Sequence, residues 1–228
     1  PSQLGSTTRG TFEFFFDGSA VDLTTGGEDI DAIVYRDDGS LLLSVYGSAK
    51  VGDLRGQDED LLRFTPTTLG TATAGSWDLY FDGSAVELTK DNEDVGAATF
   101  DTSGNLYLAT KGNYSAVSLT SIQGDDDDLF GCTLSATGEN VTSCTFFAFF
   151  NGDLVRFNRP IDGVGLKSSN PATLFEISSS SESDDGEQFE VVPDEPVTDD
   201  AEFNIYDQLQ TDETPLVDVE IYLPLISR

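Results

Sequence analysis

The chain has 228 residues, which is long enough to bury a core as one large or two small domains. It contains 42 Asp and Glu residues, 11 Lys and Arg residues and no histidine, so its formal charge is −31. This charge repels phosphate backbones and anionic surfaces, so we expect no nucleic-acid partner. No apolar run approaches the ~18 residues of a membrane span, so we expect no membrane insertion.

The N-terminal part shows that the chain contains a repeat. The hexapeptide Phe16–Val21 (FDGSAV) returns letter for letter as Phe81–Val86, and a third, degraded copy begins at Phe149-Phe150-Asn151-Gly152. Repeats of this kind indicate a duplicated β-rich unit. Before the first unit, aromatic residues over Phe12–Phe16 predict an orphan strand with one face on a core, the last strand of a missing predecessor.

Each full unit is expected to contain four short strands separated by turns. In the first unit we predict strands at Ala32–Arg36, Leu41–Tyr46, Leu61–Thr65 and Ser76–Phe81. In the second we predict Ala97–Phe100, Leu106–Thr110, Leu129–Leu134 and Cys144–Phe150. No segment outside these shows an apolar helical rhythm, and Gly, Ser and Thr are spread throughout. The sequence therefore predicts an all-β fold.

The first hairpin of each unit, Asp37–Ser44 and Asp101–Ala109, resembles the first hairpin of NHL-type and related bacterial propeller blades, over residues 12–165. The resemblance implies propeller-like four-stranded repeats, two clear and one degenerate. A closed propeller typically has about four blades or more. The missing sheets are therefore expected from residues 165–228, from a sandwich-like closure, or from neighbouring subunits.

Two acidic loops recur in each unit, and the last of them spans Asp125–Asp128. Clustered carboxylates favour a hard cation with about six to eight oxygen ligands, as Ca²⁺ has in proteins, and the lack of histidine disfavours transition metals. The alternative is a solvated acidic surface that keeps the protein soluble. The predicted Ca²⁺ ligands are Glu28, Asp29, Asp31, Asp58, Glu59, Asp60, Glu93, Asp94, Asp126, Asp127 and Asp128.

Cysteines and glycosylation motifs favour an oxidising, extracellular setting. Cys132 and Cys144 flank a turn between two predicted strands, so they could form one disulfide; the alternative is two buried thiols. Asn113 and Asn140 begin Asn-X-Ser/Thr triplets in predicted loops and are candidate glycosylation sites. A chain that begins at Pro1 rather than Met is expected to be a trimmed, mature form.

The last part of the chain is acidic, with a serine run and several prolines, a composition typical of a flexible linker. It nevertheless contains β-type runs at Phe189–Val192, Phe203–Tyr206 and Val217–Ile226. Its ending, Ile221–Arg228 (IYLPLISR), resembles the endings of many secreted proteins of filamentous Chloroflexota-type bacteria, which implies a bacterial cell-surface protein. We therefore expect an N-terminal segment with the orphan strand (1–30), a repeat domain (31–165) and an acidic β-rich segment that joins the core or donates a strand (166–228).

The lack of histidine removes the commonest general base and the usual Ser-His and Cys-His pairs, so we expect no enzyme. The favoured hypothesis is a structural subunit of an extracellular fibre or sheath, stabilised by Ca²⁺ and assembled from copies of itself by strand exchange. A Ca²⁺-dependent module that binds surface carbohydrate is the alternative, with Tyr35, Tyr46, Trp77, Tyr107 and Tyr114 as sugar platforms. A glycosidase that uses two carboxylates is a distant third.

Overall fold

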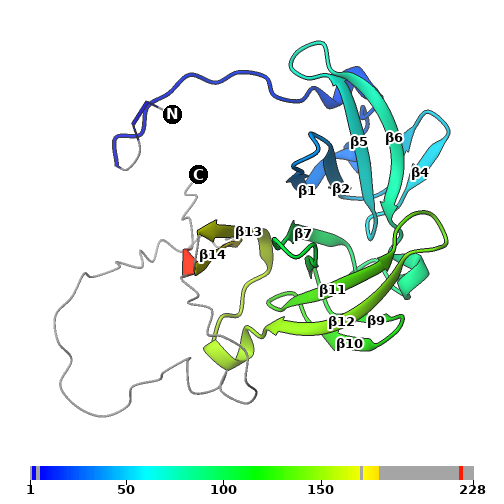
Figure 1. Ribbon diagram of the computed structural model, residues 1–228, viewed down its shortest axis with the longest axis vertical. Helices are drawn as coiled ribbons and strands as arrows, with labels where there is room; N and C mark the ends of the chain where they lie inside the picture. Colours follow the sequence, from blue (N-terminus) through cyan, green and yellow to red (C-terminus); the bar gives the residue numbers. More distant parts are fainter. Residues whose placement is uncertain (1, 4–5, 170–171, 180–220, 223–228) are drawn as a thin grey trace.

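The computed structural model describes residues 2–3, 6–169, 172–179 and 221–222. This part of the chain is all-β, as predicted, and holds two four-stranded antiparallel sheets of the same strand order (Figure 1). The first sheet consists of β1 (Ile30–Tyr35), β2 (Leu41–Val45), β5 (Leu61–Thr68) and β6 (Ala74–Phe81). The second consists of β7 (Val95–Phe100), β8 (Leu106–Thr110), β11 (Leu129–Ala136) and β12 (Ser143–Phe150). The eight predicted strands are therefore confirmed.

Each sheet carries a small extra hairpin between its second and third strands, which the sequence pattern did not reveal. The hairpin of the first sheet is β3 (Ala49–Val51) with β4 (Leu54–Gly56), and that of the second is β9 (Tyr114–Val117) with β10 (Ser121–Gly124). Strands of three or four residues are too short to show a period in the sequence.

Each copy of the hexapeptide repeat folds into a short 3-10 turn. These turns are η1 (Gly18–Val21), η3 (Ser84–Val86) and η4 (Asp153–Val155), and a separate turn, η2 (Gly26–Glu28), precedes β1. A left-handed residue follows each copy: Asp22 (φ 74°), Glu87 (φ 66°) and Arg156 (φ 59°). The degraded third copy therefore has the same local structure as the other two. We call η1 through β6 unit one, η3 through β12 unit two, and η4 onward unit three.

Unit three begins with an antiparallel pair, β13 (Ile161–Ser169) and β14 (Ala172–Ser179), to which β15 (Ile221–Tyr222) adds in parallel. Strand β13 runs across the predicted boundary between residues 165 and 166. The predicted runs Phe189–Val192 and Phe203–Tyr206 lie outside the described residues, as does most of Val217–Ile226. No helix among the described residues is long and apolar enough to cross a membrane.

The units pack face to face, and their first strands lie together, with β7 between β1 and β13 (Figure 1). The main core fills the space between the two sheets: Leu42 and Phe81 of unit one meet Val86 and Leu106 of unit two. A second core lies on the opposite face of the first sheet, and a third lies between unit two and unit three. The predicted disulfide is present and joins Cys132 on β11 to Cys144 on β12.

The orphan strand expected at Phe12–Phe16 is not formed. Only Phe16 makes a β-bridge, with Gly70, while Phe12 is fully exposed and Phe14 is 67 % exposed. The expectation that these aromatic residues pack in a core was therefore wrong for Phe12 and Phe14. The reason is the lack of a partner, because no strand of the described chain pairs with residues 12–15.

Candidate functional site

Acidic loops occupy the junctions where one unit meets the next. The first junction loop, residues 57–60, precedes β5 and clamps the start of unit two. Asp60 accepts hydrogen bonds from the backbone N–H groups of Gln57 and Gly83, both at 2.9 Å. The backbone carbonyl of Asp58 accepts the N–H of Val95, the first residue of β7, at 3.0 Å. This loop therefore ties the third strand of unit one to two separate points on unit two.

The second junction loop, residues 125–128, makes the equivalent contacts to unit three, but more loosely. Asp128 accepts the N–H groups of Asp125 and Gly152 at 3.4 and 3.2 Å. The carbonyl of Asp126 accepts the N–H of Ile161 at 3.0 Å. Because its hydrogen bonds are longer, the Asp128 carboxylate keeps more capacity to accept another partner than Asp60 does.

A glycine of the hexapeptide repeat lies directly beneath each loop. A Cβ added at Gly83 would meet the Glu59 carbonyl oxygen at 2.4 Å, and one added at Gly152 would meet Asp127 Oδ1 at the same distance. Only a residue without a side chain permits this approach. In both loops the backbone carbonyl and the side chain of one acidic residue lie against the glycine: Glu59 in the first and Asp127 in the second.

The carboxyls of the first junction loop are suited to hold protons near neutral pH. Burial, with the Asp58 carboxyl alongside, raises the pKa of Glu59 to about 8. Burial also raises the pKa of Asp60 to about 6, although its two backbone hydrogen bonds act in the opposite direction. A protonated Glu59 can donate to a neighbouring carboxylate, which relieves the repulsion without a cation.

The second junction loop brings three carboxylates together. Oxygen atoms of Asp125, Asp127 and Asp128 all lie within 4.8 Å of one another. Oδ1 of Asp125 and Oδ1 of Asp127 are buried and accept no hydrogen bond. Burial and the Asp125 carboxyl raise the pKa of Asp127 to about 7. Asp126, Asp127 and Asp128 were predicted as ligands; the structure groups Asp127 and Asp128 with Asp125, which the predicted set lacked, and not with Asp126.

Two other predicted ligands hold backbone loops. Glu28 accepts the N–H groups of Thr24 and Thr25 at 2.7 Å and that of Lys50 at 3.1 Å. Burial opposes ionisation of Glu28, but these three donors outweigh it and hold the pKa of the carboxyl below its usual value. Glu93 repeats the arrangement in unit two with the N–H groups of Thr89, Lys90 and Ser115. These carboxylates are already saturated with donors.

Asp31 and Asp94 share a lysine at the boundary of the first two units. The Lys111 Nζ lies 2.6 Å from Asp31 and 3.3 Å from Asp94. Burial raises the pKa of Asp94 to about 7, against the attraction of Lys111. The remaining predicted ligand, Asp29, is exposed, and its carbonyl accepts the N–H of Tyr46 at 2.8 Å. The Lys111 ammonium group therefore already offsets negative charge at Asp31 and Asp94, two of the predicted metal ligands.

A second feature of interest is the N-terminal segment, which docks on unit one through contacts that recur between unit one and unit two. The Phe15 carbonyl accepts the Gly70 N–H at 2.8 Å, and the Asp17 N–H donates to Thr73 Oγ1 at 2.9 Å. One repeat later, the Tyr80 carbonyl accepts the Gly138 N–H at 2.9 Å, and the Asp82 N–H donates to Thr142 Oγ1 at 2.9 Å.

The aromatic contacts repeat in the same way. The rings of Phe15 and Tyr35 meet edge to face with centroids 5.7 Å apart, and those of Tyr80 and Phe100 do so at 6.1 Å. Phe16 packs on the second core of unit one, beside Phe64 and Trp77. Residues 15–17 therefore occupy on unit one the place that the end of β6 occupies on unit two.

On the face of unit one that carries this segment, β1 is uncovered. Ile30, the first residue of β1, is 41 % exposed, whereas the equivalent Val95 and Ile161 are 0 % and 1 % exposed. At Gly18 the nearest atoms to an added Cβ belong to Leu23 and Phe16, so no acidic loop lies over this glycine. Ile33 and Tyr35 are also exposed. Within the described part of the chain, unit one thus lacks the preceding unit that units two and three each have.

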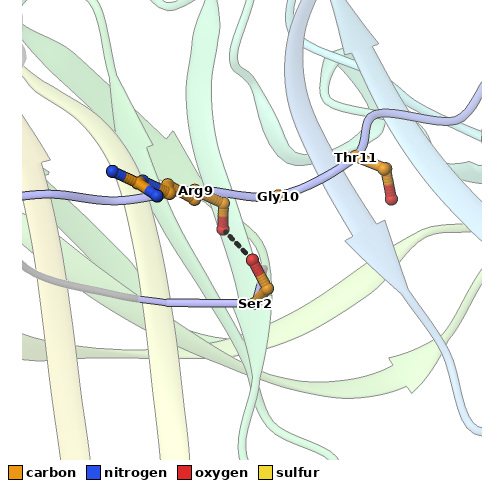
Figure 2. Close-up of a pocket in the computed structure, with 4 residues that line it drawn as sticks. All are labelled: Ser2, Arg9, Gly10 and Thr11. Atoms are coloured by element: carbon orange, nitrogen blue, oxygen red, sulfur yellow. Dashed lines mark hydrogen bonds between the residues drawn. The ribbon is translucent and has the colours of Figure 1, made fainter.

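Other candidate features give weaker indications. Tyr107 and Tyr114 are buried, which excludes them as sugar platforms, while Tyr35 and Tyr46 are exposed. Asn113 and Asn140 are both exposed, so glycosylation stays a prediction. Figure 2 shows a shallow hollow between Ser2 and the exposed residues 9–11, where the Ser2 hydroxyl donates to the Arg9 carbonyl at 3.2 Å. It contains no carboxylate and offers no catalytic pair.

Comparison of the chain with protein-family models, curated proteins and solved structures gives no significant match. Functional inference therefore rests on the comparison of the repeated units with one another.

Proposed function

We propose that this protein is a non-enzymatic structural subunit that assembles with copies of itself into an extracellular fibre or surface sheath. In this assembly the N-terminal segment of one copy supplies the last strand of an incomplete unit in the next copy. One observation carries the proposal: residues 15–17 dock on unit one as the end of β6 docks on unit two, yet they belong to no sheet.

The sequence of the segment supports the role of a donated strand. Residues 11–18 (TFEFFFDG) align with residues 76–83 (SWDLYFDG), so Phe12 corresponds to Trp77 and Phe14 to Leu79. Trp77 and Leu79 contribute to the core on the far face of their own sheet, away from unit two. The exposed Phe12 and Phe14 therefore have the pattern of residues that complete the core of a sheet preceding unit one. Aromatic residues of this kind, left in water, favour pairing with an open sheet edge.

A second copy of the chain is the occupant that the repeat favours. Within the chain, the faces of units two and three equivalent to the open face of unit one are covered by a preceding unit of the same design. The terminal unit of another copy supplies that design. Such a contact joins different surfaces of the two partners, so it continues head to tail as a filament unless the rotation closes a ring.

The disulfide supports an extracellular setting, because oxidised cysteines persist mainly outside the reducing cytosol. Strand donation also fits a protein without a histidine-based active site, since main-chain hydrogen bonds provide the affinity and side-chain pockets the specificity.

The test compares the full chain with the variant Phe12→Ser/Phe14→Ser by sedimentation velocity and negative-stain imaging. We expect fibres or long oligomers from the original chain and monomers from the variant. Both substitutions lie on exposed side chains, so the folded subunit should keep its thermal stability. Leu119→Ser, at a residue 63 % exposed elsewhere, is the matched control and should assemble normally.

A peptide of residues 10–18 should also block growth when added in excess, because it competes for the same sheet edge. A monodisperse monomer of the original chain would overturn the proposal and would indicate that the segment folds back onto its own chain. Fibres that persist in the double-serine variant would equally contradict it.

A further inference from the structure

The second junction loop has the spacing of a cation site. Its three carboxylates place oxygen atoms within 4.8 Å of one another. Two oxygens bound to one Ca²⁺ at about 2.4 Å each can lie at most about 4.8 Å apart, so one ion can contact all three groups. Spacing alone is not sufficient, because acidic clusters are common on protein surfaces.

A buried carboxylate oxygen without a partner supplies the independent observation. Asp127 is only 5 % exposed, and its Oδ1, held against Gly152, accepts no hydrogen bond. Oδ1 of Asp125 is also buried and accepts no hydrogen bond. Buried polar atoms normally have a partner, and an ionised carboxylate without one is costly. A cation held between these groups would satisfy both oxygens.

The protein provides no positive charge at this place. Among the described residues, no ion pair involves the loop 125–128. The buried Asp94, which also has an unpartnered oxygen, lies 3.3 Å from Lys111. The nearby Asp153 adds a further negative charge to the second loop. Within the described residues, no side-chain cation therefore offsets the negative charge of the second junction loop.

The first junction loop makes equivalent backbone contacts but carries different side chains. Gln57 stands where the second loop has Asp125, and Glu59 stands where it has Asp127. Each oxygen of Asp60 accepts one hydrogen bond of 2.9 Å, and none of the three residues has a buried oxygen without a partner. Of the two junction loops, only the second therefore has buried carboxylate oxygens without a hydrogen-bond partner.

We propose that the second junction loop binds one Ca²⁺ through Asp125, Asp127 and Asp128, with water completing the coordination. All the ligand atoms are hard oxygens, which favours Ca²⁺ or Mg²⁺ over transition metals. Ca²⁺ fits better, because it accepts irregular carboxylate geometry, whereas Mg²⁺ requires near-octahedral ligands and gives up water reluctantly. The bound ion would fasten unit two to unit three beside Gly152. This inference does not depend on self-assembly.

The test is calorimetric titration of Ca²⁺ into the full chain after removal of divalent ions. We expect one site per chain, with a Kd on the order of 10⁻⁴ to 10⁻³ M, the range of extracellular Ca²⁺ modules. Asp125→Gln, which places the residue of the first loop in the second, should weaken binding by at least about tenfold, since one of three ligands is lost. Asp127→Asn should do the same.

Asp53→Asn is the matched control, because Asp53 is an exposed carboxylate in the β3–β4 turn, outside the loop. It should bind Ca²⁺ as the original chain does. Circular dichroism checks that each variant is folded, and Asp125→Gln should fold because glutamine is native at the equivalent position. A folded original chain that binds no Ca²⁺ at about 10 mM, above the weakest extracellular sites, would overturn the proposal. So would unchanged binding by both loop variants.

Discussion

The first and second junction loops make the same backbone contacts but carry different carboxyl groups. In both, an aspartate accepts the N–H of a repeat glycine, and a loop carbonyl accepts the N–H of the first residue in the first strand of the next unit. The first loop also contains Glu59, whose pKa of about 8 lets its carboxyl group stay protonated at neutral pH. The second leaves two buried carboxylate oxygens without donors. One backbone design therefore holds two different sets of buried carboxyl groups, and only the second set leaves oxygen atoms without a hydrogen-bond partner.

The sheets of the two units differ in a similar way. At equivalent positions, unit two joins Cys132 to Cys144, whereas unit one has Phe64 packed over Gly75. A Cβ at Gly75 would meet the Phe64 ring at 2.6 Å, so the aromatic ring occupies the space that the second cysteine takes in unit two. A disulfide thus links β11 to β12 in unit two, and an aromatic contact joins the equivalent strands, β5 and β6, in unit one.

The largest effect is expected where the junction backbone is tightest. Gly83→Ala should cost about 3 kcal/mol of unfolding free energy, because its Cβ collides with a backbone oxygen that cannot move without breaking the junction. Urea unfolding measures this loss. Gly26→Ala, where no atom lies within 4 Å of the added Cβ, is the control and should change stability little. A Gly83→Ala protein as stable as that control would mean that the loop does not clamp unit two.

Removal of the disulfide should come next. Cys132→Ser/Cys144→Ser should lose about 2–3 kcal/mol, because the unfolded chain regains the freedom of the closed loop. Chemical unfolding of the variant beside the oxidised original chain measures the difference. A much smaller effect of the disulfide variant would mean that packing alone holds β11 to β12.

The pH dependence of stability tests the protonated glutamate. The pKa of Glu59 lies near 8 in the folded chain, against about 4.3 for an exposed glutamate. The folded state therefore holds the proton more tightly, and stability that is present below about pH 4.5 is lost as pH rises toward 8.

Glu59→Gln should remove this part of the pH dependence. Between about pH 5 and about pH 8.5, in chelator, the original chain should lose on the order of 1–2 kcal/mol more than the variant, after allowance for solvent screening. Urea unfolding at both pH values measures this. Equal losses in the two proteins would show that Glu59 is ionised throughout the range.

The smallest effect is expected at a surface pair that unit two lacks. Arg63 contacts both carboxylate oxygens of Asp78 across β5 and β6, where unit two has Gly131 and Phe147. Both partners are more than one-third exposed. A double-mutant cycle with Arg63→Ala and Asp78→Ala should therefore give a coupling free energy below about 1 kcal/mol. A coupling above about 2 kcal/mol would show that this pair, rather than apolar packing, holds the strands together.

The sequence alone determined the features that depend on local residues and their period. The hexapeptide copies revealed the repeated units, β-type runs between turns located the eight main strands, and two cysteines flanking a turn indicated the disulfide. It could not show which carboxylates lack partners, because Glu28 and Asp127 look alike as acidic residues in loops. Glu28 is satisfied by backbone N–H groups that only the fold brings to it.

Tertiary structure alone decided which β-type segments of the described chain have a pairing partner. The sequence of Phe12–Phe16 has the pattern of a strand, but a strand exists only where another strand pairs with its backbone, and the described chain provides none. The same holds for Ile30, which the sequence equates with Val95 and Ile161 and which packing alone leaves exposed. Burial and hydrogen bonding depend on neighbours distant in the sequence, so they appear only once the units are placed together.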